Sequence, residues 1–508
     1  MDDLMPVTTT HQSYEDNSDR WKTMRDVING EDAVKAEKTR YLPQPAGRSD
    51  EDFDKYILRA QFFDATGKTA AGMVGGVFRK PPKVDIATAI EYLLEDADGK
   101  ATPLSQLAKD ATQEVVGLGR VGVLVDMPDV PEVKRLDEER AMGADARLYL
   151  YPAESIINWS YARVGSAYQL SRVVLREEIE QQNVDDEFES EQVESYRVLD
   201  LEADDASKEI GAGYRVRVFQ SVDGEMELIS EYRPTAPGGE RMDFIPFTFI
   251  GAGDNTAAVD KPPLLDIANV NVGHYRNSAD YEDAIFMVGQ PTPVITGLDS
   301  QFIEKHKGQF VIGSRTAWML PANTSASMLE SSRDLAALAN AMERKEGQMI
   351  QLGARLIDSN PSGVEAAETI RLRQSGEASV LASVAENVSR GFQTALSWAS
   401  EWMGGGEDAE FACNTDFFPQ RLSSADLKEL VASWQGGVIT YGTLFENLVT
   451  GEVITAGTDQ EDYEAELEEE ALKNPAPALG DDDIDPEDDE EVEDEDEEEE
   501  DEDLTEED

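Results

Sequence analysis

The amino-acid sequence predicts a protein of the α+β class, and three patterns along the chain carry this prediction. Apolar residues recur at helical spacing as far as Leu118, alternate at strand spacing from Val121 to Ile250, and return to helical spacing from Pro262. Strands grouped between two helical stretches are typical of an α+β protein. The chain has 508 residues, and one hydrophobic core serves about 250–300, so we expect two to four subdomains.

The N-terminal half is expected to change from helices to strands near residue 119. The expected helices, each with one apolar face, span 16–29, 50–75, 86–94 and 104–118. The expected strands are 121–125, 148–151, 169–177, 195–201, 214–221, 225–232 and 244–250. The acidic stretch 177–194 is expected to be a solvated connection.

The C-terminal half is expected to be mainly helical. A helix should follow Pro262-Pro263 and end at Gly289. Two short strands are expected at 293–296 and 310–312, and a third at 411–414. Further helices are expected at 327–357, 363–403, 424–435, 440–450 and 459–473. Residues 474–508 are expected to be disordered, because they have too little apolar surface to offset ordering.

The charge distribution argues against two classes of function. Lysine and arginine number 44 against 106 aspartates and glutamates, so the net charge is 44 − 106 = −62. Residues 481–508 hold 23 acidic and no basic residues, which leaves 44 − 83 = −39 for residues 1–480. Binding nucleic acid through a basic face depends on neutralising phosphates, and attraction to an anionic membrane also needs cations. We expect neither of these, and no membrane partner.

Cysteine usage and the N-terminus indicate a reducing compartment. Cys413 is the single cysteine, so no disulfide framework can form within the chain. The first residues lack the basic and apolar regions of a secretory signal, and no apolar run is long enough to span a membrane. We expect the protein to remain in the cytosol unless it joins a larger particle.

The chain carries no pattern that indicates catalysis. Gly117-Leu-Gly-Arg-Val-Gly122 matches G-x-G-x-x-G, but a helix precedes it and a strand follows, the reverse of a dinucleotide site. We interpret it as a glycine helix cap and a tight turn. The histidines lie far apart, so we expect no zinc site, and His274 is expected to be a hydrogen-bonded interfacial residue. We therefore expect no enzyme activity, no cofactor and no metal.

Several local strings, in this order along the chain, resemble the portal proteins of tailed bacteriophages, which connect head to tail. The strings are Tyr41-Leu-Pro43, Phe62-Phe-Asp-Ala-Thr66, Gly75-Gly-Val-Phe-Arg-Lys-Pro-Pro82, Gly119-Arg-Val-Gly-Val-Leu-Val-Asp126, Pro262-Pro-Leu-Leu-Asp266, His274-Tyr-Arg-Asn-Ser-Ala-Asp-Tyr281, Gln290-Pro-Thr-Pro-Val294 and Ala367-Glu-Thr-Ile-Arg-Leu-Arg373. Each string is weak alone, and their order is what makes the resemblance specific. It covers about residues 10–470, and the acidic extension after Gly480 departs from it.

The resemblance implies a portal-like architecture whose order agrees with the expected helices and strands. The implied parts are an N-terminal arm and mixed α/β wing (1–262), a first stem helix (263–289), a small clip (290–326), a second stem helix (327–357), a tunnel loop (358–363), a long wing helix with a return strand (364–420), a helical crown (421–473) and a disordered acidic tail (474–508).

The resemblance also implies function and partners. Portal proteins form a closed ring of about twelve copies, a homododecamer, at one capsid vertex of the virion. Double-stranded DNA passes through the channel, without sequence-specific binding, during packaging and ejection. The implied partners are the protein itself, the major capsid protein, the large terminase subunit and then a head-completion adaptor. Assembly would take place in the cytoplasm of a bacterial host, and the motor rather than the portal would hydrolyse nucleotide.

Candidate site residues follow from this architecture. Candidate cations facing DNA are Arg333, Arg344 and Lys345 on the second stem helix, with Lys305 and Lys307 in the clip. The tunnel loop would consist of Asp358, Ser359, Asn360, Pro361, Ser362 and Gly363. Alternatively, the cations form ion pairs within or between subunits with Glu330, Asp334, Glu343 and Glu346. Residue patterns leave both alternatives open.

Subunit packing is assigned to the long wing helix, through Val380, Val384, Val388 and Phe392. On that basis Val384→Asp is expected to abolish ring formation by burying an unpaired charge. Two other functions remain as alternatives. One is an acidic host-interaction or chaperone-like protein that acts through residues 481–508. The other is a nucleotide-dependent enzyme that uses Gly117–Gly122.

Overall fold

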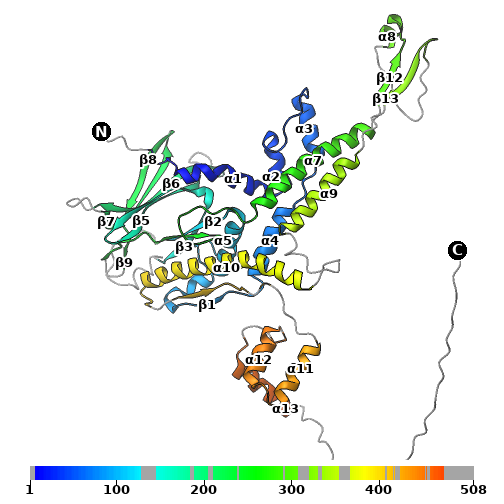
Figure 1. Ribbon diagram of the computed structural model, residues 1–508. Helices are drawn as coiled ribbons and strands as arrows, with labels where there is room; N and C mark the ends of the chain where they lie inside the picture. The colour runs from blue at the N-terminus through cyan, green and yellow to red at the C-terminus, as the bar shows by residue number, and fades with distance from the viewer. Residues whose placement is uncertain are drawn as a thin grey trace, which may run out of the picture. The chain divides into compact units, whose positions relative to one another are not determined.

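The computed structural model describes the chain in two compact units, Met1–Phe418 and Pro419–Asp508, which are treated separately below. The described residues are 6–126, 145–182, 188–203, 210–222, 224–236, 240–289, 292–306, 320–329, 335–353, 367–406, 409–415, 417, 424–451, 453–454 and 458–473. Figure 1 shows their helices and strands. Among these residues, no helix is long and apolar enough to cross a membrane.

The first unit begins with five α-helices. They are α1 (Gln12–Asn29), α2 (Glu31–Ala36), α3 (Asp50–Arg59), α4 (Ala65–Val77) and α5 (Leu104–Leu118). The prediction of a single helix over 50–75 was wrong, because the structure has two helices there, α3 and α4. The chain leaves helical geometry at Ala60, and the Asp64 carboxylate starts a new helix by accepting a hydrogen bond from Gly67 N at 3.1 Å.

The G-x-G-x-x-G stretch forms a helix cap and a turn, as predicted. Gly119 ends α5 with a φ of 87°, in the left-handed region that glycine adopts without strain. A Cβ at this position would lie 2.9 Å from the Asp260 carbonyl oxygen. The following strand, β2, leads away from the turn, so no helix N-terminus faces a pyrophosphate there.

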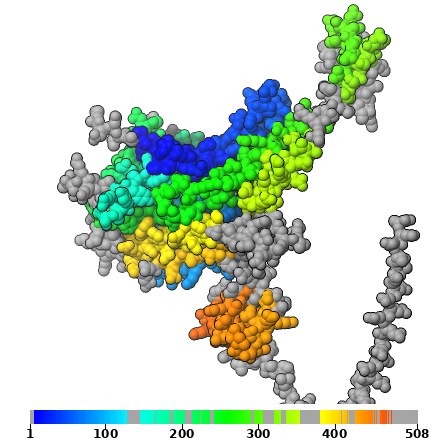
Figure 2. Space-filling view, viewed as in Figure 1, coloured from blue at the N-terminus to red at the C-terminus, as the bar shows by residue number. Residues whose placement is uncertain are grey.

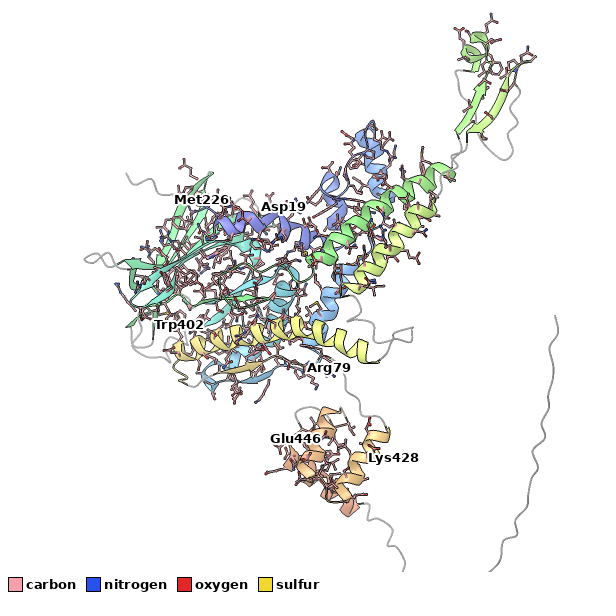
Figure 3. All side chains as sticks on the ribbon, in the orientation of Figure 1. Asp19, Arg79, Met226, Trp402, Lys428 and Glu446 are labelled. Carbon is pink, nitrogen blue, oxygen red and sulfur yellow. The ribbon has the colours of Figure 1, made fainter. Side chains whose placement is uncertain are left out.

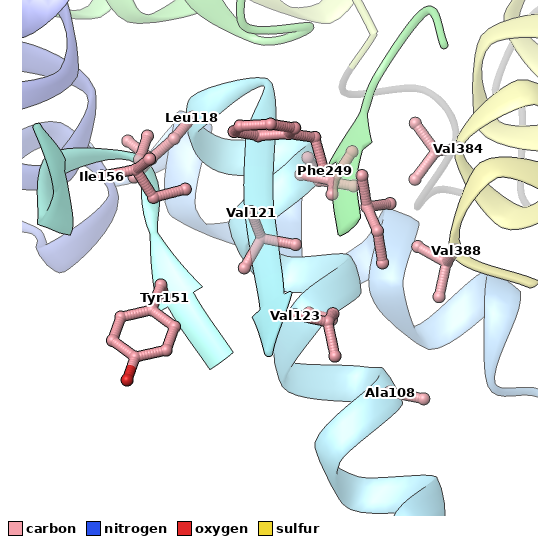
Figure 4. Packing of buried hydrophobic residues seen from close by; sticks show 14 of the residues in the cluster. Ala108, Leu118, Val121, Val123, Tyr151, Ile156, Phe249, Val384 and Val388 are labelled. Atoms are coloured by element: carbon pink, nitrogen blue, oxygen red, sulfur yellow. The ribbon is translucent and has the colours of Figure 1, made fainter. Parts of the chain in front are cut away.

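A three-stranded antiparallel sheet lies in the main core. Its order is β11 (Phe247–Gly251), β2 (Arg120–Asp126) and β3 (Arg147–Pro152). Each residue of β2 before Asp126 is buried, because α5 and the long helix α10 (Ala367–Trp402) both pack against this strand. Figure 4 shows Val384 and Val388 of α10 beside Phe249 of β11.

This packing corrects the assignment of the long wing helix to subunit contacts. Val384, Val388 and Phe392 are fully buried within their own chain. Only Val380 is exposed, at 45%. The helical spacing of these residues marks the face that covers the subunit's own sheet. Val384→Asp would therefore bury a charge inside the subunit and unfold it before any effect on a ring.

A second, five-stranded antiparallel sheet follows the chain as a simple meander. Its strands are β4 (Ile156–Val164), β5 (Ala167–Gln182), β6 (Ser190–Ala203), β7 (Ile210–Val222) and β8 (Glu225–Tyr232). Two predictions were wrong here. β4 was missed, and the acidic stretch 177–194 is largely strand, since pairing continues from Glu177 with Ser195 to Gln182 with Ser190. Cross-strand pairing overrides the poor strand propensity of glutamate.

The remaining helices of the first unit are α7 (Leu265–Gly289), α8 (Ser300–His306), α9 (Ala336–Gln351) and α10. Of these, α8 was not predicted, and α9 is shorter at both ends than the helix predicted over 327–357. The helix expected from residue 327 starts later, because β13 (Ser325–Leu329) pairs with β12 (Thr292–Thr296) as a hairpin. The strand expected at 310–312 lies outside the described residues.

Two contacts fix the C-terminal end of this unit to distant parts of the chain. β14 (Glu410–Ala412) pairs with β1 (Lys83–Asp85). Trp402, labelled in Figure 3, donates a hydrogen bond from its indole nitrogen to the Thr235 carbonyl oxygen at 2.8 Å. Thr235 belongs to β9 (Thr235–Ala236), which pairs with β10 (Glu240–Arg241).

Within its described residues, the second unit has three helices close to their predicted bounds. They are α11 (Ser424–Gln435), α12 (Tyr441–Thr450) and α13 (Gln460–Lys473). The Phe445 and Tyr463 rings hold α12 against α13, with centroids 5.6 Å apart. The predicted disordered tail, 474–508, lies outside the described residues.

Candidate functional site

The candidate site is the pair of helices α7 and α9, called the helix pair below. Between them the chain forms the β12–β13 hairpin and α8, and α9 then returns alongside α7 (Figure 1). The space-filling view shows α7 and α9 in contact along their length (Figure 2). Ile267, Val272 and Tyr275 are among the buried apolar residues of α7. The helix pair is therefore joined to the main core.

Polar side chains on α7 bind the chain around residues 61–66. The Asn271 side-chain oxygen accepts a hydrogen bond from the Thr66 hydroxyl at 2.9 Å, and its nitrogen donates to the Phe63 carbonyl oxygen at 2.7 Å. Ser278 accepts from the Gln61 backbone N–H at 3.0 Å. Because Asn271 is fully buried, losing a partner would leave an unsatisfied polar group. These contacts set the position of α7.

Further along α7, charged groups bind α3 and the residues before it. Asp283 forms ion pairs with Arg48 and with Arg59, the latter at 2.8 Å. Partial burial opposes ionisation of Asp283, but the two arginines outweigh it and hold the pKa of this carboxyl below its usual 3.8. The Tyr56 hydroxyl donates to Asp280 at 2.6 Å. Burial, and then the Asp280 carboxylate, raise the pKa of Tyr56.

His274 lies between the two helices, and its Nε2 is 3.1 Å from a Glu346 carboxylate oxygen. Only 3% of the residue is exposed. This confirms the prediction that His274 is a hydrogen-bonded interfacial residue. Glu346 was one of the carboxylates predicted to pair with the candidate cations, and in the structure it contacts His274 instead.

Two of the predicted channel cations form a cluster with a third that the sequence reasoning missed. The charges of both Arg344 and Arg276 of α7 act on Lys345, and the Arg276 Nε donates to the Tyr41 carbonyl oxygen at 2.8 Å. Burial, and then the positive charges of Arg344 and Arg276, lower the pKa of Lys345. None of these cations forms an ion pair within the described part of its own chain.

Lys305, a predicted clip residue, lies in α8. Several other predicted site residues lie outside the part of the chain that the structure describes. Arg333, Lys307 and the tunnel loop 358–363 lie outside the described residues. The same holds for Glu330 and Asp334, two of the carboxylates proposed as partners of the cations. Of the candidate cations, Arg344 and Lys345 are consecutive on α9, and Lys345 packs against Gly273 of α7.

The C-terminal end of α7 exposes four consecutive apolar residues, called the apolar end below. The exposed fractions are 39% for Ile285, 40% for Phe286, 59% for Met287 and 42% for Val288. Successive helix residues point about 100° apart, so these side chains surround the helix. A run of four large apolar residues directly before a helix-ending glycine was the available signal, and the sequence reasoning did not use it.

Comparison with known proteins matches only part of the chain to a family. Residues 263–403, from α7 to the end of α10, match a family described as a domain of unknown function, DUF4055. No curated protein matches the chain.

Similar solved structures come from gene transfer agent particles. One is the virion of a native particle, with 13% identity, a TM-score of 0.37, and coverage of 82% of this chain and 98% of the other. Another is the neck of an empty particle computed with C6 symmetry, with 12% identity, a TM-score of 0.37, and coverage of 81% and 96%. A third is the neck of a native particle computed with C12 symmetry, with 12% identity, a TM-score of 0.38, and coverage of 82% and 97%.

Proposed function

We propose that the protein is a portal subunit of a tailed bacteriophage, which assembles into a closed ring of about twelve copies in the virion. The apolar end of α7 is the observation that carries the proposal. The helices of the chain itself and the resemblance of its ordered strings to portal proteins support it further.

The apolar end is unsuited to a free monomer. Residues Ile285–Val288 are 39–59% exposed around α7, with the Arg59 guanidinium over the Phe286 ring, and a helix that is apolar all round is normally buried all round. A single flat partner would cover only one side of this helix end. In a ring each subunit has two neighbours, which together cover two sides of the helix end.

The charge of the chain suits a DNA conduit. Each phosphate that a lysine or arginine neutralises adds affinity, which would act as friction on DNA that must slide. Residues 1–480 carry 44 − 83 = −39, so the ring as a whole repels the duplex. In this proposal the DNA passes without binding to any particular sequence.

The proposed partners follow from a ring at a capsid vertex. The major capsid protein would surround it, and the large terminase subunit would dock on the hairpin side during packaging. A head-completion adaptor would then replace the terminase. The ring itself would have no enzyme activity, because the terminase hydrolyses the nucleotide that drives DNA inward.

Purification of the full chain tests this proposal. Sedimentation velocity should show one large species at micromolar concentration, and negative-stain images should show rings with a central hole. A protein that remains monomeric or dimeric under the same conditions would refute the proposed function.

A further inference from the structure

The cation cluster on the helix pair forms no ion pair with the described residues of its own subunit. Arg276, Arg344 and Lys345 are called the basic flank here. Lys345 lies against α7, with its Cε 3.3 Å from the position that a Cβ on Gly273 would occupy. Arg276 is held by the Tyr41 carbonyl oxygen. Lys345 and Arg276 are thus held in place, and Arg344, which follows Glu343 and precedes Lys345 on α9, is exposed.

Two carboxylates without ion pairs lie on the other side of the same helices. Glu282 on α7 and Glu343 on α9 are called the acidic flank, and neither forms an ion pair with a described residue. Glu282 follows Gly273 by nine residues, which places it about 180° around α7. Glu343 precedes Lys345 by two residues, which places it about 200° around α9.

We infer that the basic flank of one subunit binds the acidic flank of the neighbouring copy, so that Arg344 and Lys345 pair with Glu282 and Glu343 across each interface of the ring. This inference rests on the proposed function. Opposite charges on opposite sides define a head-to-tail contact, and such contacts close into rings when the rotation between copies allows it.

A second copy fits the basic flank better than DNA does. Lys345 is partly buried and Arg276 is hydrogen-bonded, so these cations cannot follow a moving backbone as long, free side chains could. The matching carboxylates stand at fixed positions on the same two helices. Ion pairing of this kind orients partners and excludes wrong registers.

Mixing two charge-reversed proteins tests the inference. The first carries Arg344→Glu and Lys345→Glu, so both of its flanks are acidic. The second carries Glu282→Lys and Glu343→Lys, so both of its flanks are basic. Each should lose the ring because like charges meet at every interface. An equimolar mixture should regain rings in which the two proteins alternate, as sedimentation and native mass spectrometry would show.

Controls separate this inference from folding and from the proposed function. Lys55→Glu with Glu51→Lys on α3 reverses an exposed ion pair and should leave the ring unchanged. Neutral variants, Arg344→Gln with Lys345→Gln, test the same contact if a reversed protein does not fold. They should raise the protein concentration needed for assembly and weaken its dependence on salt.

The other outcomes overturn the inference. If wild type forms rings and both reversed proteins also do, the flanks do not meet, although the proposed function stands. If rings of the Arg344→Glu, Lys345→Glu protein form but pass DNA at a different rate from wild-type rings, the cations face DNA rather than a neighbouring copy. Failure of the equimolar mixture to form rings, with both proteins folded by circular dichroism, also refutes it. Absence of rings in wild type refutes the proposed function itself.

Discussion

Arg120 is a cation buried without a hydrogen-bond partner among the described residues. It lies at the start of β2 with 1% of its surface exposed, and none of its guanidinium nitrogens has a partner there. The guanidinium carbon lies 4.6 Å from the centre of the Trp159 ring and 4.4 Å from that of Phe249. Burial lowers the pKa of Arg120 to about 10, against the opposing effects of Tyr161 and Asp260. The aromatic faces are its main compensation.

Arg120→Met should leave the free energy of unfolding unchanged or raise it by up to about 2 kcal/mol, because an apolar chain avoids the desolvation of an unpaired charge. Urea unfolding of the full chain measures this. The matched control is Arg25→Met, which removes a cation that pairs with Glu114 at 2.7 Å and Glu154 at 3.0 Å. The control should lose about 1–3 kcal/mol, since two carboxylates lose their partner. A larger loss for Arg120→Met than for Arg25→Met would contradict this account.

Asp283 makes the stability of the α3–α7 contact depend on pH. Its pKa in the folded protein lies below the ordinary value of 3.8, so the folded state binds its proton less readily than the unfolded state. The stabilisation is therefore fully present above about pH 4 and is lost as the pH falls through the lower, folded pKa.

Asp283→Asn should destabilise the protein by about 1–2 kcal/mol at pH 7, because two arginines lose a charged partner. The difference from wild type should shrink below pH 4, which urea unfolding at a series of pH values would measure. Asp266→Asn, which affects only the exposed ion pair with Lys261, is the control. A difference that stays constant down to pH 3 would exclude the ion pairs as its cause.

Among the helices, α7 shows how one element serves two purposes. Its first half is held to the core by Asn271, Ser278 and buried apolar residues, so it is part of the subunit's own fold. Its last turn exposes Ile285–Val288. Substitutions in the part of α7 that binds the core and α3 should therefore change stability, and substitutions at Ile285–Val288 should change assembly.

Met287→Glu combined with Val288→Glu should abolish rings and leave the free energy of unfolding within about 0.5 kcal/mol of wild type, since both side chains are already solvent-exposed. Sedimentation velocity and urea unfolding measure the two effects. Val438→Glu is the control, because Val438 is 78% exposed in the second unit and should leave both unchanged. Rings that persist in the double variant would remove the main support for the proposed function.

At the scale of the whole molecule, the net charge must be outweighed by contacts for any ring to form. Residues 481–508 contribute 23 of the 62 net negative charges, and all copies of the ring would share this repulsion. Screening by salt reduces it, with a Debye length of about 10 Å at 0.1 M.

A chain ending at Gly480 should still form rings and should do so at lower salt than wild type, because removing the acidic segment lowers repulsion between copies. Sedimentation across a series of salt concentrations would measure this. If the shortened chain fails to assemble at every salt concentration, the acidic segment takes part in assembly, which favours the alternative of a protein that acts through its tail.

Local sequence patterns were sufficient to predict helix ends and turns whose conformation depends on neighbouring residues. The bounds of α5 and α11 were predicted without error, since proline, serine and glycine mark helix ends through backbone geometry. The helical spacing of Val384, Val388 and Phe392 likewise identified a buried face of α10. A buried face does not reveal its partner, and the assignment to a neighbouring subunit was wrong for that reason.

The sequence by itself determined the change from helices to strands and back to helices, the acidic balance, and the glycine turn between α5 and β2, because these depend on local conformation and composition. The tertiary structure alone decided that α10 covers the subunit's own sheet, that β14 pairs with β1, and that Arg276 joins Arg344 and Lys345. It also decided which apolar residues stay exposed, including the end of α7. Each of these depends on residues far apart in the chain, and their contacts form only when the whole subunit packs.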